Sequence, residues 1–218
     1  MKMMKSVMLF VLAALMLQPA FSQSEKFTGA MKKNIAALDS ALSKNEIASL
    51  TDIAASFERI GDAEKTQWLP FYYAAYCRIT LAFVKNEVAE NDIVADKVDE
   101  LIGKASALEK NNSEISLLKA MNASIRMLVN PMQRWMEYGQ KSQQYSQDAM
   151  TQDPANPRPY WFNGVSLKNT PAEFGGGCGA AKPLLDKALE LYAGFKPASE
   201  LHPNWGKQVC EKEAAGCK

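Results

Sequence analysis

The sequence has little of what an enzyme active site usually needs. Its 218 residues include one histidine, His202, and they contain neither a Gly-x-Ser-x-Gly nucleophile elbow nor a His-Glu-x-x-His zinc motif. A Ser-His-Asp triad would have to use His202, whose segment 201–206 is more typical of a turn that caps the last helix. Scattered cysteines and one histidine also fit a metal site poorly. We therefore predict a protein that is not an enzyme, with no cofactor and no metal site.

An excess of charge of one sign is also missing. The chain has 25 basic and 24 acidic side chains, spread along its length, and a formal net charge of +1. Proteins that bind nucleic acids usually have a basic stripe or a much larger positive charge. We therefore expect no nucleic acid among the partners of this protein.

The apolar run near the N-terminus is too short for a membrane span. It covers residues 7–17, about 11 residues, whereas a spanning helix needs roughly 20. Two lysines precede the run, and proline and small residues follow it up to Ser22, which is the pattern of a secretory signal peptide at residues 1–22. The cleavage region has no cysteine to accept a lipid. We expect a mature chain, residues 23–218, that is periplasmic or secreted and has no membrane span.

The two-residue alternation that a β-sheet would need is not sustained anywhere in the sequence. Apolar residues recur three and four positions apart instead, which predicts amphipathic helices joined by short loops, as in antiparallel helix pairs. Gly61 is expected to end the second helix, and a ring-rich helix over 66–85 is expected to form the core. Later helices are expected over 91–108, 113–128 and 132–150. The predicted fold is all-α, a single domain of stacked antiparallel helix hairpins.

Four cysteines predict a disulfide, because thiols outside the cytosol tend to oxidise. Cys77 lies in an aromatic run and is expected to be a buried free thiol. Cys210 and Cys217 lie seven positions apart, about 10.5 Å along a continuous helix, which exceeds the span of a disulfide unless the helix breaks near Gly216. We expect Cys178 to pair with Cys210 or with Cys217. Either bridge would link the glycine-rich loop to the C-terminal helix.

The glycine-rich loop at residues 175–179 admits two interpretations. Glycines let backbone amides approach an anion, as in phosphate-binding loops. However, no strand precedes this loop and no Gly-Lys-Ser/Thr follows it. We favour a structural loop that needs positive φ angles at several positions, and keep ligand contact through the loop as the alternative.

Residues 66–195 resemble degenerate tetratricopeptide repeats, in which two antiparallel helices repeat about every 34 residues. The second helix of such a repeat has small residues seven apart and is closed by a proline, as Ser142, Ala149 and Pro154 are spaced here. The next first helix would carry Tyr160, Asn163, Gly164 and Leu167, and a last second helix would carry Ala181, Leu185 and Ala188. The resemblance implies a short α-solenoid, with a C-terminal capping helix at about 203–216.

Three segments, at 156–161, 170–177 and 201–206, are similar to exported repeat proteins of the Bacteroidota, whose function is largely unassigned. A second similarity, in the glycine-rich turn and the helix after it, is to periplasmic repeat subunits that accompany some transporters. These resemblances imply binding rather than catalysis. The leading hypothesis is a secreted or periplasmic adaptor whose helical groove binds a protein or peptide. The alternative is a small-molecule-binding module associated with an envelope transporter.

Aromatic residues beside an arginine form the candidate binding site. Arg158 precedes Tyr160 and Trp161, and Tyr145 lies one helix earlier. In stacked hairpins the first helices line the binding surface, where exposed rings and an arginine would anchor a peptide, an anionic group or a sugar. Many of these rings are also expected in the core. We predict ligand or partner contacts for Arg158, Tyr160, Trp161 and Tyr145.

Overall fold

The computed structural model describes residues 25–85 and 87–217, so the predicted signal peptide lies outside the described residues. This part of the chain contains helices and no strand. In chain order the elements are α2 (Glu25–Ser43), η1 (Ile47–Ser49), α3 (Leu50–Glu64), α4 (Leu69–Lys85), η2 (Val88–Glu90), α5 (Asn91–Leu108), α6 (Ser113–Leu128), α7 (Pro131–Arg134), η3 (Trp135–Gly139), α8 (Gln140–Gln152), α9 (Pro157–Lys168), η4 (Ala172–Phe174), α10 (Cys178–Gly194) and α11 (Lys207–Ala215). None of the described helices is long and apolar enough to cross a membrane.

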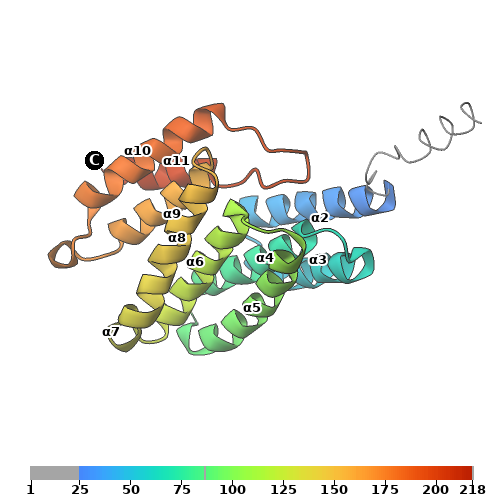
Figure 1. Cartoon of the computed structure of the whole chain (residues 1–218), viewed down its shortest axis with the longest axis horizontal. Helices are drawn as coiled ribbons and strands as arrows, with labels where there is room; N and C mark the ends of the chain where they lie inside the picture. The colour runs from blue at the N-terminus through green and yellow to red at the C-terminus, as the bar shows by residue number, and fades with distance from the viewer. Residues whose placement is uncertain (1–24, 86, 218) are drawn as a thin grey trace, which may run out of the picture.

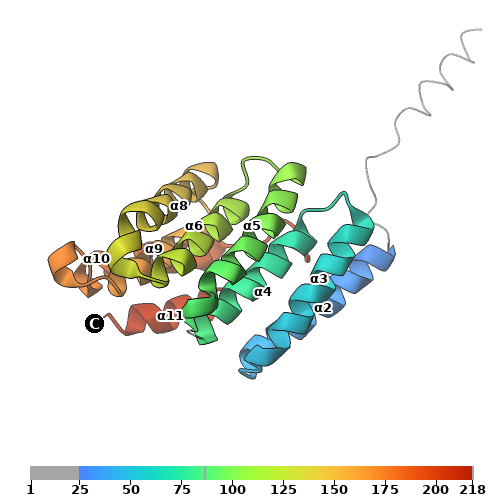
Figure 2. The same ribbon diagram turned by 90° about the horizontal axis from the view of Figure 1, so that it is seen from below.

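The helices pair as hairpins that lie side by side along the molecule (Figures 1 and 2). The pairs are α2 with α3, α4 with α5, α6 with α8, and α9 with α10, and α11 packs on α10 at the C-terminal end. The predicted all-α arrangement of helix hairpins is confirmed. Helix α11 begins at Lys207 and is shorter than the capping helix predicted from about residue 203.

Helix α4 is the centre of the core, as its ring-rich sequence predicts. It contacts α3, α5 and α6, so that nearly its whole first half is enclosed. The helix begins later than predicted, at Leu69, because Pro70 suits the first turn of a helix, where a backbone N–H has no partner within the helix. The residues of its first half are all buried: Leu69, Pro70, Phe71, Tyr72, Tyr73, Ala74, Ala75, Tyr76 and Cys77.

Small residues allow α6 and α8 to approach each other closely. Ser142, Ser146 and Ala149 are buried on the face of α8 that meets α6. The Ser142 hydroxyl donates to the carbonyl of Ala120 at 2.9 Å, and the Ser113 hydroxyl donates to the carbonyl of Ala149 at 2.7 Å. The small residues spaced along the predicted second helix thus serve close packing, and the Ser142 hydroxyl bonds to the backbone of α6.

Two further helix boundaries differ from the sequence prediction. Gly61 does not end α3, which continues to Glu64 and ends at Lys65 in the left-handed conformation, with φ 61°. Gly61 is needed for packing instead, because a Cβ there would lie 2.7 Å from the Phe71 ring. The helix predicted over 132–150 is interrupted: a π-helical turn at Trp135–Gly139 separates α7 from α8.

The chain between α10 and α11, residues 195–206, forms what we call the strap. It runs from the end of α10 toward α2 and returns to α11 (Figure 1). Leu201 is buried, and its carbonyl accepts a hydrogen bond of 3.0 Å from the Tyr73 hydroxyl. Trp205 stacks on Tyr76 with ring centroids 4.4 Å apart. The strap therefore covers part of the face that α2 and α4 present.

A disulfide between Cys178 and Cys217 joins the start of α10 to the residues after α11. The chain has passed through the turn at Gly216 before it reaches Cys217. Cys77 and Cys210 are free and buried. The pairing is one of the two that the sequence left open, and the prediction that Cys77 is a buried free thiol is confirmed.

We predict that the contact between α9 and α10 depends on Gly164. An added Cβ would lie 2.7 Å from the side chain of Leu185 and 3.3 Å from its backbone nitrogen. Gly164→Ala should lower the free energy of unfolding by about 1 to 3 kcal/mol, because the helices must separate. Gly103→Ala in α5 is the matched control: it meets nothing within 4 Å and should be neutral or stabilising. Equal stability of the two variants in urea unfolding would contradict the close approach.

The disulfide should contribute substantially to stability. It closes a loop with a sequence separation of 39 residues. On the chain-entropy argument Cys217→Ser should lower the free energy of unfolding by about 3 to 4 kcal/mol. Chemical unfolding with and without reductant measures this difference. Reductant should destabilise the wild type and leave Cys217→Ser unchanged, and a wild type that is insensitive to reductant would contradict the prediction.

Candidate functional site

A cavity of about 450 Å³ lies where the N-terminal ends of α6 and α9 meet the strap. We call it the main cavity. One part of its wall is apolar, formed by Trp68, Phe195, Pro197, Ala198 and Pro203. The rest is polar: Glu109, Asn111, Asn112, Ser113, Glu114, Gln152, Asp153, Asn156, Arg158, Lys196 and His202. The cavity thus offers both a surface for a flat apolar group and hydrogen-bonding groups.

Glu114 is the centre of a buried polar network beneath the cavity. It occupies the first turn of α6, where the Asn112 side chain caps the helix by accepting bonds from the backbone N–H groups of Glu114 and Ile115. One carboxylate oxygen accepts a bond of 2.8 Å from the Tyr72 hydroxyl. The other accepts a bond of 2.6 Å from the Asn156 amide. A negative charge at a helix N-terminus is favourable, so this position suits a buried carboxylate.

Arg158 is the cation that pairs with Glu114. Its Nε and Nη2 atoms lie 2.7 and 2.6 Å from the same carboxylate oxygen, and the residue is 2% exposed. Its guanidinium lies over the ring of Phe195, 4.6 Å from the centroid, and 5.4 Å from that of Trp205. Burial opposes the charged form, but the Glu114 carboxylate outweighs it and raises the pKa of Arg158 above its ordinary value.

The network also fastens the strap to the helices. The Trp205 Nε1–H donates to the Tyr72 hydroxyl at 2.9 Å, and Arg158 Nη1 donates to the Trp205 carbonyl at 3.4 Å. The Tyr192 hydroxyl donates to that same carbonyl at 3.3 Å. Trp205 is therefore held by its ring nitrogen and by its backbone. Because burial raises the pKa of Tyr72 well above its ordinary value, this hydroxyl remains a hydrogen-bond donor at neutral pH.

His202 lies in the strap and lines the main cavity. Its Nδ1 atom lies 2.7 Å from the Ser199 hydroxyl oxygen, and its ring meets Trp68 edge to face at 5.8 Å between centroids. Burial lowers the pKa of His202, so the neutral imidazole is favoured. The sequence predicted that segment 201–206 is a turn that caps the last helix. Its last residue, Gly206, does occupy the N-cap position of α11, with φ 106°, but no side chain caps the helix.

The four predicted contact residues do not share one surface. Of these, Arg158 lines the main cavity, but as a buried ion-pair partner. Trp161 is half-buried and meets Trp205 edge to face at 5.7 Å, while Tyr160 packs with the residues of α10 and α11. Tyr145 packs against the main core. Binding roles for Tyr160, Trp161 and Tyr145 remain predictions.

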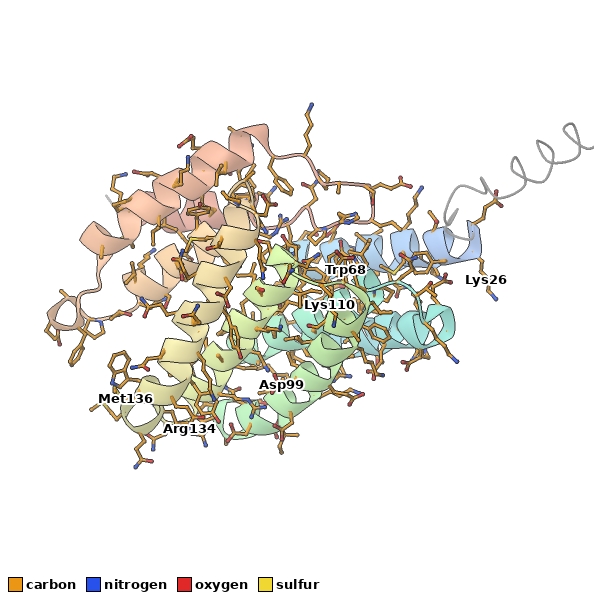
Figure 3. The ribbon with its side chains drawn as sticks, viewed as in Figure 1. Lys26, Trp68, Asp99, Lys110, Arg134 and Met136 are labelled. Atoms are coloured by element: carbon orange, nitrogen blue, oxygen red, sulfur yellow. A yellow bond between two sulfur atoms is a disulfide. The ribbon has the colours of Figure 1, made fainter. Side chains whose placement is uncertain are left out.

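The cavity residues that the sequence analysis missed come from distant parts of the chain. Trp68, Glu114 and Phe195 lie in three separate segments, and no spacing relates them. His202 was assigned to a turn. The aromatic and polar residues of segment 201–206 could have indicated that this segment lines a cavity. The sequence analysis used them for the resemblance to exported repeat proteins instead. Figure 3 shows Trp68 at the start of α4, beneath the strap.

The glycine-rich loop follows the structural interpretation. Gly175 and Gly177 have positive φ angles of 82° and 86°. The backbone N–H groups of Gly176 and Gly177 donate to the carbonyls of Pro171 and Leu167, at 3.1 and 2.8 Å. These amides are occupied within the loop and do not form a cradle for an anion.

The described residues thus form an all-helical structure with its main cavity between helix ends and the strap. No protein-family model matches the chain, and no curated protein matches it. Among solved structures, the chain is similar to the HusA haemophore from Porphyromonas gingivalis, with 36% sequence identity and a TM-score of 0.80. The match covers 91% of this chain and 96% of that one. The chain belongs to the same family as HusA.

Removing the arginine of the buried pair should be costly. Arg158→Ala leaves the Glu114 carboxylate buried without its cation, and we expect the free energy of unfolding to fall by about 3 to 5 kcal/mol. Lys182→Ala is the control, because the Lys182–Asp186 pair is more than half exposed and should contribute less than about 0.5 kcal/mol. Urea unfolding compares the two variants. A similar small loss in both would mean that the buried pair does not stabilise the fold.

Proposed function

We propose that this protein is an exported binding protein, not an enzyme, and that its main cavity binds haem or a related tetrapyrrole. The observation that carries the proposal is the family relationship: a protein named as a haemophore shares 36% of its residues with this chain over nearly its whole length. Identity at this level, together with a common fold, supports a common class of ligand. The proposal belongs to the second function that the sequence predicted, a small-molecule-binding module.

The chemistry of the main cavity supports this ligand class. A tetrapyrrole is a flat apolar ring that carries carboxylates on one edge. Trp68 and Phe195 would face the ring, while Lys196, which is exposed and has no ion pair among the described residues, would face the carboxylates. The volume of about 450 Å³ lies within the usual range of ligand sites, roughly 300 to 1,000 Å³. Arg158 is held by Glu114 and would act mainly by placing Phe195.

Export to the periplasm or to the medium is part of the proposal. The disulfide between Cys178 and Cys217 supports it, because such bonds persist in oxidising compartments. The sequence of residues 1–22 supports it independently, as a secretory signal.

The packing of small residues between α6 and α8 supports the tetratricopeptide-like repeat. In that scheme the hairpins supply a rigid frame and the strap supplies the ligand site.

An adaptor for a protein or peptide is the second candidate. An apolar surface at the π-helical turn favours it: Met132, Trp135 and Met136 are 87%, 54% and 59% exposed. Exposed apolar groups close together are typical of interaction sites. Met136 lies far from Trp68 in Figure 3, so this surface is separate from the main cavity. Small-molecule binding would therefore depend on Trp68 in the main cavity, whereas an adaptor would depend on Met132, Trp135 and Met136.

Titration with haemin tests the proposal. Absorbance and tryptophan fluorescence would follow binding to the mature chain. Trp68→Ala should weaken haemin binding about tenfold or more, because it removes the ring wall of the cavity. The matched control is Trp135→Ala, an exposed tryptophan at the other surface, which should leave the affinity unchanged. Absence of haemin binding by the wild type would refute the proposal, and a loss confined to Trp135→Ala would move the site to the π-helical turn.

A further inference from the structure

A second cavity, of about 180 Å³, lies on the other side of the strap from the main cavity. It is enclosed by α2, by α4 and by the strap. Its lining residues are Ile35, Leu38, Asp39, Leu42, Tyr73, Tyr76, Glu200, His202, Asn204 and Trp205. His202 is the residue that lines both cavities. His202 is therefore the residue at which the two cavities meet in the described structure.

Few contacts hold the His202 side chain in this position. Its hydrogen bond goes to Ser199, an exposed residue of the same strap, and its ring touches the Trp68 edge. An exposed hydrogen bond is readily exchanged for one to water and contributes little net stability. Rotation of the side chain would leave the backbone of the strap in place, because the anchors of the strap are Leu201 and Trp205. Moving the His202 side chain therefore does not require unfolding.

The second cavity, like the main cavity, has both apolar and polar groups in its wall. Its apolar groups are Ile35, Leu38, Leu42 and the rings of the tyrosines and Trp205, and Asp39, Glu200 and Asn204 add polar groups. Asp39 also lies there, and burial raises the pKa of its carboxyl. No hydrogen bond or ion pair of Asp39 occurs among the described residues. Glu200 also lines this cavity, but it pairs with Lys32 at 2.6 Å. The unpaired Asp39 therefore disfavours a ligand carboxylate at this end, whereas Lys196 would attract it at the other.

We propose that the two cavities are halves of one groove, that the bound tetrapyrrole displaces His202, and that its apolar edge enters the second cavity. This inference rests on the proposed function. The carboxylate edge of the ligand then lies in the main cavity, on the side of Lys196, and the apolar edge lies against Leu42 and Tyr76. Lys196 at one end and Asp39 at the other favour this orientation of the ligand. His202 is a gate in this scheme and not a ligand-binding residue.

Two variants test the gate and the second half of the groove. His202→Ala removes the imidazole and should raise the association rate constant of haemin, measured by stopped-flow fluorescence, about tenfold. Leu42→Trp fills the second cavity and should weaken haemin binding about tenfold, because the apolar edge is displaced. Ile93→Trp adds the same ring at an exposed position of α5 and should have no effect. Circular dichroism checks that each variant is folded, and Ile35→Phe replaces Leu42→Trp if the latter does not fold.

The outcomes separate this inference from the proposed function. An unchanged or lower association rate in His202→Ala would overturn the gate, and a lower affinity would show instead that the imidazole contacts the ligand. Haemin affinity that is unaffected by the filled second cavity would overturn the shared groove. Either result leaves the main-cavity proposal standing as long as Trp68→Ala weakens binding. If the wild type does not bind haemin, the proposed function fails first and the inference fails with it.

Discussion

The carboxylate of Glu114 is the group on which the arrangement of the site depends. A buried ionised carboxylate is costly unless its oxygens are bonded and a cation is close. Tyr72 from α4, Asn156 at the N-cap of α9 and Arg158 in its first turn meet these requirements together. The charge can be tolerated only when three hairpins and the strap are in their places, because Arg158 and Tyr72 also bind Trp205. A buried apolar group of the same size in place of Glu114 would not require these distant segments to lie in fixed positions.

The strap changes the surface that a row of hairpins would otherwise expose. An uncovered row offers a long open groove along its first helices. Here Leu201 and Trp205 lie against α4, and Lys32 of α2 pairs with Glu200 at 2.6 Å. The face that the strap covers becomes two cavities that are walled on several sides. Such walls favour a small ligand over an extended peptide, since a small ligand gains most from burial on several sides.

The helices were predictable because their signals are local. The ring-rich α4, the small residues of α8 and the buried Ala181, Leu185 and Ala188 of α10 all follow from spacing within one helix. The site was not predictable in the same way. Tyr72 and Trp205 are 133 positions apart, and Arg158 and Glu114 are 44 apart. A single sequence shows that Arg158 is charged and near rings, but not that its charge is neutralised by Glu114 of α6.

The burial of two thiols determines the covalent chemistry of the chain. Burial raises the pKa of Cys77 to about 12 and that of Cys210 to about 11, so neither forms the thiolate that attacks a disulfide at neutral pH. Cys210 is only seven positions from Cys217 and would compete for Cys178 in an unfolded chain. Once α11 packs on α10, the Cys210 thiol is buried and can no longer attack the bond between Cys178 and Cys217. Packing thus selects one partner among equivalent sulfurs, and a mispaired molecule must be corrected before the last helix docks.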